Sequence, residues 1–222
     1  MTIKYGAIVF TDIVGSSKLW KIHGSKMDKA LEQHNKRIRQ FVSNKPNKRF
    51  SFRKDKKKGT IIKTIGDAFM IHFDNSIHAL ECFLKVQQSF VDNPITLGKD
   101  KIRIRVGICY GKLFVHHTNV QGKNLIDYFG TTVNTASRME SEVCRPDEVV
   151  LSYSNTTIPQ TEIKNILEKY PFQLTITKYK EKCTLSEKIK RSFRLISKYK
   201  CESVKKLHGV PAIDALIFTP HN

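Results

Sequence analysis

The chain has 222 residues, 40% of them hydrophobic, and a formal net charge of +19, a size and composition that suit one compact domain with a full core. The longest apolar runs, such as residues 6–10, fall far below the roughly 18 residues of a membrane-spanning helix, and no basic leader opens the chain, so we expect a soluble, cytoplasmic protein. Its five cysteines are odd in number and lack CxxC spacing, which argues against a disulfide framework and a zinc site.

Hydrophobic periodicity and turn residues divide the chain into strands and helices. The predicted strands cover about residues 4–10, 60–64, 68–73, 102–108, 113–116, 149–151, 172–178 and 212–218. The predicted helices cover about residues 25–43, 76–90, 133–143 and 160–169. Turns are expected at residues 65–67 and 110–112, each closing a hairpin, and residues 117–128 read as a polar connection. This order of elements predicts an α+β fold, with an antiparallel-rich sheet and helices packed on one face.

Two segments carry most of the positive charge. Residues 45–58 have an excess of seven basic side chains and residues 178–206 an excess of eight. Such runs are usually solvated loops or faces. The functional alternative is weak electrostatic contact with polyphosphate nucleotides, acidic membrane or nucleic acid.

Two aspartates stand at the ends of apolar strand-like segments, each beside a tight turn. Asp12 follows the first predicted strand, and Asp67 lies in the turn between the next two. Either residue alone would be explained as a helix cap or a turn residue. Together they form the paired carboxylates that a divalent cation requires.

A second candidate group lies on the predicted helix over residues 133–143. Asn134 and Arg138 are four residues apart and lie off the apolar stripe, so one helix face offers two donors to an anionic centre. Taken alone, such a pair is more often ordinary surface.

Four motifs in order and spacing resemble the successive signatures of the class III nucleotidyl cyclase catalytic domain. They are FTDIVGSS at 10–17, KTIGDAFM at 63–70, RVGICYG at 105–111 and DYFGTTVNTASRMES at 127–141. The resemblance covers residues 3–151 and resumes faintly at 207–210. It implies a ferredoxin-like palm that works as a head-to-tail homodimer, with a nucleoside triphosphate between the chains. We expect residues 1–222 to form one catalytic domain with a basic insertion at 45–58 and a divergent basic region at 155–206.

The reaction implied by the resemblance is attack of a ribose 3′-hydroxyl on the α-phosphorus, with pyrophosphate leaving. Two Mg²⁺ or Mn²⁺ ions per site, about 3.5 to 4 Å apart, activate the hydroxyl and neutralise the leaving oxygens. The implied metal ligands are Asp12, Asp67 and the backbone carbonyl of Ile13. Asn134 is expected to orient the ribose, and Arg138 to counter charge on the transferring phosphoryl group.

The strand-to-helix entry at Gly15, Ser16 and Ser17 is expected to bind the β- and γ-phosphates. Backbone N–H groups at a helix start point toward an anion, and the helix dipole favours it there. The alternative is an ordinary serine-rich helix start.

By the same resemblance, Lys63 and Asp127 read the base. A donor beside an acceptor complements adenine N1 and N6, whereas guanine would place its N1–H and N2–H donors against the lysine. ATP is therefore favoured over GTP. Cytosine shows the same acceptor and donor order as adenine, so a pyrimidine (cytidylate or uridylate) cyclase stays open.

One departure bears on turnover. Where many family members carry a phosphate-binding lysine in a Leu-Lys-Gly stretch, this chain has Leu207-His208-Gly209. A neutral imidazole binds triphosphate less strongly, and Lys205 or Lys206 is the alternative donor. A degenerate domain that binds nucleotide without turnover is therefore a second hypothesis.

Overall fold

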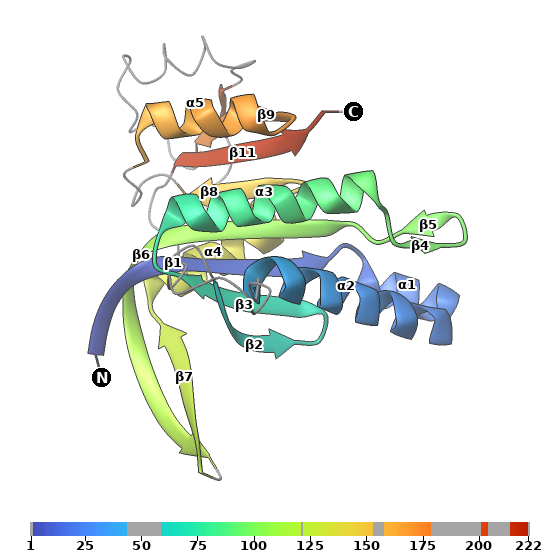
Figure 1. Ribbon diagram of the computed structural model, residues 1–222, viewed down its shortest axis with the longest axis horizontal. Helices are drawn as coiled ribbons and strands as arrows, with labels where there is room; N and C mark the ends of the chain where they lie inside the picture. Colours follow the sequence, from blue (N-terminus) through green and yellow to red (C-terminus); the bar gives the residue numbers. More distant parts are fainter. Residues whose placement is uncertain are drawn as a thin grey trace, which may run out of the picture.

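The computed structural model describes residues 2–43, 59–120, 122–152, 158–178, 201–203 and 214–221, so the basic segment at 45–58 lies outside the described residues. The elements through the central sheet are β1 (Thr2–Ile13), α1 (Ser16–His23), α2 (Ser25–Ser43), β2 (Thr60–Ile65), β3 (Ala68–Phe73), α3 (Ser76–Asp92), β4 (Thr96–Leu97), β5 (Asp100–Lys101), β6 (Ile104–Val120) and β7 (Lys123–Phe129). They are followed by α4 (Thr131–Arg138), a π-helical turn (Met139–Val143), β8 (Val149–Ser152), α5 (Gln160–Lys169), β9 (Phe172–Lys178), β10 (Cys201–Ser203) and β11 (Asp214–Pro220). Figure 1 shows their arrangement.

Within the described residues, nine strands form one sheet whose long central pair is β1 and β6. The strand order is β10-β9-β11-β8-β6-β1-β3-β2, and β7 pairs with β6. All neighbours are antiparallel except β6 with β8 and β9 with β10. The predicted α+β class and antiparallel-rich sheet are therefore confirmed.

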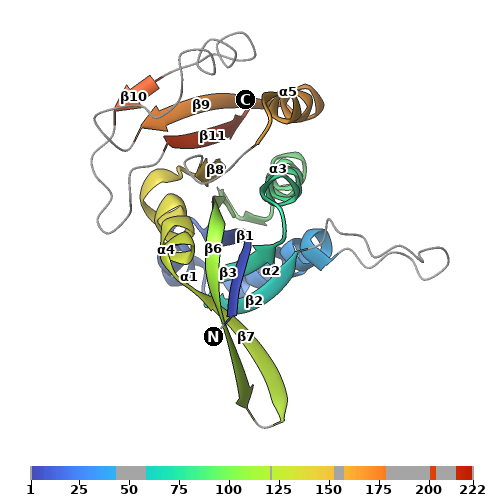
Figure 2. The ribbon, with the colours of Figure 1, turned by 90° about the vertical axis from the view of Figure 1, so that its left-hand side faces the viewer.

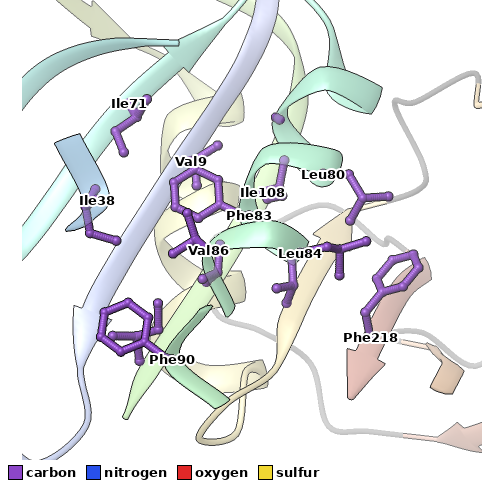
Figure 3. Packing of buried hydrophobic residues seen from close by; sticks show 14 of the residues in the cluster. Val9, Ile38, Ile71, Leu80, Phe83, Leu84, Val86, Phe90, Ile108 and Phe218 are labelled. Atoms are coloured by element: carbon purple, nitrogen blue, oxygen red, sulfur yellow. The ribbon is translucent and has the colours of Figure 1, made fainter. Parts of the chain in front are cut away.

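One face of the sheet is covered by α2 and α3. Val9, Ile71 and Ile108 on the strands pack with Phe83 of α3 in a cluster of fully buried side chains (Figure 3). Fully burying each such side chain contributes about 1.5–3 kcal/mol. Asn75 fixes the start of α3, because its Oδ1 accepts a hydrogen bond from the Ile77 N–H at 2.7 Å.

The opposite face is covered by α4, which refines the expectation of helices on one face (Figure 2). Ile8, Met70 and Cys109 alternate with the residues of the first cluster and pack against Ala136 of α4. A Cβ at Gly107 would lie 2.3 Å from the Glu140 backbone nitrogen, so only glycine lets the helix approach the strand this closely. The helix that carries Asn134 and Arg138 is thereby fixed directly on β6.

The expected turn at residues 110–112 is wrong, because β6 runs unbroken from Ile104 to Val120. Gly111 lies in mid-strand opposite Gly6 of β1, and a Cβ there would lie 2.6 Å from the Thr132 hydroxyl oxygen. This glycine therefore serves the close approach of α4 rather than a turn.

The expected polar connection at 117–128 is also wrong, since its residues form the end of β6 and most of β7. The hairpin turn lies beside Gly122, whose φ is 77°. The two strands extend well beyond the rest of the sheet (Figure 1). At the base of this hairpin, Tyr128 stacks on His72 of β3 with ring centroids 4.8 Å apart.

The described residues bear on two features expected from the sequence, the apolar runs and the cysteines. None of the described helices is long and apolar enough to cross a membrane. Cys82, Cys109 and Cys144 are free thiols, the latter two buried.

Candidate active site

The register of the sheet brings Asp12 and Asp67 together. Asp12 is the penultimate residue of β1, and the Gly66–Asp67 turn joins β2 to β3, the neighbour of β1. Gly66 has a φ of 63°, which makes this tight turn possible. Asp67 accepts hydrogen bonds from the Ile13 N–H at 3.2 Å and from the Ser16 hydroxyl at 3.4 Å. The two carboxylates expected to act together are thus neighbours at one edge of the sheet.

The electrostatics of Asp12 reflect its burial and its charged neighbours. Burial raises the pKa of Asp12, a hydrogen bond from Arg105 opposes this effect, and the charge of Asp67 raises the pKa further. A bound cation would relieve this repulsion. Within the described part of the chain no group of three or more His, Cys, Asp or Glu is placed to hold a metal ion. A carboxylate pair completed by substrate oxygens and water is, however, how Mg²⁺ is commonly held.

Ile13, expected to act through its backbone carbonyl, has a fully buried side chain. Its N–H is used by Asp67, so only its backbone belongs to this site.

Arg105 is a site residue that sequence reasoning missed. It lies opposite Asp12 in the β1–β6 pairing and donates from Nη2 to Asp12 Oδ2 at 2.8 Å. Its Nε lies 3.0 Å from Glu140 Oε1. The alternation of residues 102–108 placed Arg105 on the less apolar face of its strand, but only the pairing with β1 reveals its partner.

Glu140 is buried beneath this arginine. Burial raises its pKa to about 7, the charge of Arg105 lowers it, and those of Asp12 and Asp67 raise it. The motif that contains Arg138 also contains Glu140, but sequence alone does not show that this side chain points toward the aspartates.

The start of α1 has a glycine N-cap. Gly15 is left-handed, with φ 65° and ψ 30°, and no side chain caps the helix. Its carbonyl accepts from the N–H groups of Lys18 and Leu19. The Ser16 hydroxyl is directed to Asp67, while Ser17 is exposed.

Lys63 and Asp127, expected to read the base, are in direct contact. Lys63 Nζ donates to Asp127 Oδ2 at 2.6 Å, from β2 to β7. The β2–β3 register shifts between Ile61 and Lys63, and such a bulge re-aims a side chain. Both side chains are partly exposed, so a planar ligand can reach them.

Asn134 and Arg138 lie on the exposed side of α4, as expected. The ion-pair partner of Arg138 is Glu142, in the π-helical turn. Within one chain these two residues therefore stand apart from the hydrogen bonds and ion pairs of the two aspartates.

A cavity of about 350 Å³ lies elsewhere, near the start of α4. Its lining includes Tyr5 and Lys112, which pair across β1 and β6 seven residues along β1 from Asp12. Its lining includes no member of the three candidate pairs, Asp12–Asp67, Lys63–Asp127 and Asn134–Arg138. His208, Lys205 and Lys206 lie outside the described residues, so the departure at this motif stays a prediction.

The architecture is that of the class III cyclases. Residues 3–175 match the family model for the adenylate and guanylate cyclase catalytic domain, and the chain belongs to this family.

Both adenylate and guanylate cyclases are among the similar proteins. An adenylate cyclase from Podospora anserina is 29% identical over 182 residues, which cover 74% of this chain but 8% of that protein. A structure of a Trypanosoma brucei adenylate cyclase, described in its monomeric state, has a TM-score of 0.64 at 19% identity, covering 97% of this chain and 88% of that one. The guanylate cyclase domain from Catenaria anguillulae in complex with GTP has a TM-score of 0.63 at 16% identity, covering 100% of both chains.

Proposed function

We propose that this protein converts ATP to 3′,5′-cyclic AMP and pyrophosphate as a homodimer with composite sites. The observation that carries the proposal is the Asp12–Asp67 pair at the end of β1, beside the uncapped start of α1. Carboxylates and free N–H groups at one edge are the two kinds of group that a cation-bound triphosphate needs.

Asp12, Asp67 and the Ile13 carbonyl would hold Mg²⁺ or Mn²⁺. When bound, two such ions favour ionisation of the attacking hydroxyl and offset the charge of the leaving pyrophosphate. The raised pKa of Asp12, caused first by burial and then by the charge of Asp67, fits this role, because a bound cation would favour the ionised carboxylate against both effects.

The remaining residues bind and orient the substrate. The first N–H groups of α1, from Ser16 and Ser17, would hold the terminal phosphates. Asn134 would orient the ribose, and Arg138 would release Glu142 to balance the charge that develops on the phosphoryl group.

The choice of ATP rests on the contact between Lys63 and Asp127. With Nζ and Oδ2 2.6 Å apart, a donor and an acceptor already lie side by side, as the N1 and N6 edge of adenine requires. Guanine would place its N1–H and N2–H donors against the ammonium group of Lys63, and leaving these donors without acceptors is costly.

Two copies are proposed because the candidate groups of one chain are split. Asn134 and Arg138 point outward from α4 instead of contacting the aspartates. A second copy in head-to-tail symmetry would bring its α4 to the aspartates of the first and form two equivalent sites. Both dimeric and monomeric cyclase structures occur among the similar folds.

The experiment is a panel of ATP, GTP, CTP and UTP with purified protein, scored for cyclic product with Mg²⁺ and with Mn²⁺. We expect cyclic AMP as the main product, and its loss in Asp67→Ala. The matched control is Asp74→Ala, a surface aspartate paired with Lys4, which should retain activity.

Three other results would count against the proposal. Cyclic CMP or UMP as the main product would favour the pyrimidine alternative. Tight nucleotide binding by a demonstrated dimer without pyrophosphate release would favour the degenerate domain. Equal product from the wild type and Asp67→Ala would remove the carboxylate pair from the reaction.

A further inference from the structure

The buried carboxyl group of Glu140 has no role in the function proposed above. Glu140 is 8% exposed, and its Oε1 lies 3.0 Å from the Nε of Arg105 in an ion pair. Neither of these two atoms has a hydrogen bond of good geometry within the described residues. A buried carboxyl group held against an arginine calls for an explanation, because the desolvation cost of burying two charges is offset only by good geometry and further hydrogen bonds.

The backbone around Glu140 is specialised. Glu140 lies in the π-helical turn that follows α4, and such turns occur frequently at functional sites. A Cβ at residue 107 would lie 2.3 Å from the Glu140 backbone nitrogen, so the turn can lie this close to β6 only because residue 107 is glycine. The turn is thus pressed onto β6 one strand away from Asp12.

Arg105 connects Glu140 to the proposed metal site. One guanidinium contacts Asp12 through Nη2 at 2.8 Å and Glu140 through Nε at 3.0 Å. Its Nη1 donates to the Ser141 carbonyl in the same turn at 3.4 Å. Two of the three guanidinium nitrogens are therefore engaged by the π-helical turn, and one reaches Asp12.

We infer that Glu140 is a positioning residue that keeps Arg105 in single contact with Asp12 and so preserves the capacity of Asp12 to bind a divalent cation. The inference rests on the metal role proposed for Asp12 and Asp67.

The physical reason is competition for the Asp12 carboxylate. A guanidinium freed from Glu140 can turn to bind both carboxylate oxygens in a bidentate pair, which is the stronger arrangement. It would then occupy lone pairs that a cation needs, and its uncompensated positive charge would repel that cation. An anionic Glu140 prevents both effects.

The experiment compares Glu140→Gln with Asp147→Asn, using Mn²⁺ alone as the probe at pH 8 and the EPR signal of free Mn²⁺ as the readout. We expect Glu140→Gln to weaken Mn²⁺ binding on the order of tenfold, as loss of an outer-shell partner typically does. Asp147 makes the analogous ion pair, at 2.6 Å, with Arg103, which lies two residues before Arg105. Asp147→Asn should leave Mn²⁺ affinity unchanged, since asparagine tolerates the positive φ of 71° at this position.

A double-mutant cycle tests whether Glu140 acts through Arg105. In an Arg105→Met background, Glu140→Gln should have no further effect on Mn²⁺ affinity, whereas an independent role would give additive losses. Circular dichroism of each variant verifies its fold.

Asp67→Asn separates this inference from the proposed function. If Asp67→Asn abolishes Mn²⁺ binding while Glu140→Gln binds as tightly as Asp147→Asn, the positioning role is refuted and the metal site stands. If Asp67→Asn binds Mn²⁺ like the wild type, or the wild type binds none, the metal site fails and the inference fails with it.

Discussion

Asp67 accepts hydrogen bonds from residues 54 and 51 positions earlier in the chain, Ile13 and Ser16. A single turn residue thus fixes the end of β1 and the start of α1, and its charge acts on the neighbouring carboxylate of Asp12. Its importance at the residue scale follows from these three connections rather than from its own burial.

Lys63 and Asp127 should determine whether the protein prefers ATP or GTP. Replacing both residues, as Lys63→Glu with Asp127→Ser, offers acceptors to the N1–H and N2–H of guanine and a donor to O6. We expect the ratio of kcat/KM for ATP over GTP to fall at least about a hundredfold. Steady-state assays with both nucleotides measure this ratio.

The control for this prediction is Lys112→Glu, a charge change on an exposed lysine outside the three candidate pairs. It should leave the ratio unchanged. An unaltered ratio in the double variant would remove Lys63 and Asp127 from base recognition.

The buried side chain of His72 should make the stability of the folded protein depend on pH. Burial lowers its pKa to about 4, with the charge of Lys4 acting in the same direction and Asp74 opposing. The unfolded value is about 6.5, so between these limits the unfolded chain binds more protons and stability falls as the pH falls. This contribution is complete above pH 6.5 and lost as the pH approaches 4.

His72→Phe keeps a ring against Tyr128 but cannot be protonated. We expect the wild type to lose roughly 1–3 kcal/mol relative to this variant between pH 6.5 and 4, measured by urea unfolding across that range. His117→Gln, on an exposed part of β6, should follow the wild-type profile. Parallel curves for His72→Phe and the wild type would contradict the prediction.

Among the elements, α4 depends most on the strand beneath it. Gly107 and Gly111 let the helix approach β6, and the Thr132 hydroxyl donates to the Lys112 carbonyl at 2.7 Å. The position of Asn134 and Arg138 is therefore set by two glycines on a strand rather than by the helix itself.

Gly111→Ala should destabilise the protein by about 1–3 kcal/mol, because its Cβ would lie 2.6 Å from the Thr132 hydroxyl oxygen. Urea unfolding measures the loss. In a Thr132→Ala background the obstructing atom is gone, so the same glycine substitution should cost less. Equal losses in both backgrounds would show that α4 does not limit the space at this position.

Local sequence patterns predict some of the strands, helices and turns of this protein and not others. The hydrophobic alternation and the Asn75 cap predict α3, β3 and the Gly66–Asp67 turn because each depends on neighbours a few residues away. Gly111 breaks the same pattern, and a glycine at a turn cannot be told from one beneath a helix without knowing what packs on it. The failed prediction of a turn at 110–112 has this cause.

For the whole molecule, the separation of Arg138 from the two aspartates predicts complementation between inactive chains. Asp67→Ala and Arg138→Ala should each be nearly inactive as purified homodimers. An equal mixture that exchanges subunits should recover about a quarter of wild-type activity, because half of the dimers are mixed and each has one intact site. Cyclic-product assays before and after exchange measure the recovery.

The control mixes Asp67→Ala with Asp12→Ala, since both changes fall in the same half of the proposed site. This mixture should recover nothing. Recovery in neither mixture, despite demonstrated exchange, would place the whole site within one chain.

The sequence by itself determined the family motifs, the α+β class and most elements, because these depend on residue types at short spacings. It also identified Asp12, Asp67, Lys63 and Asp127 as candidates. The tertiary structure alone decided that Arg105 joins Asp12 to Glu140, and that Lys63 touches Asp127, since each contact links strands or turns that lie 35 or more residues apart. Strand register and helix packing set those contacts, and neither is a property of any local stretch of chain.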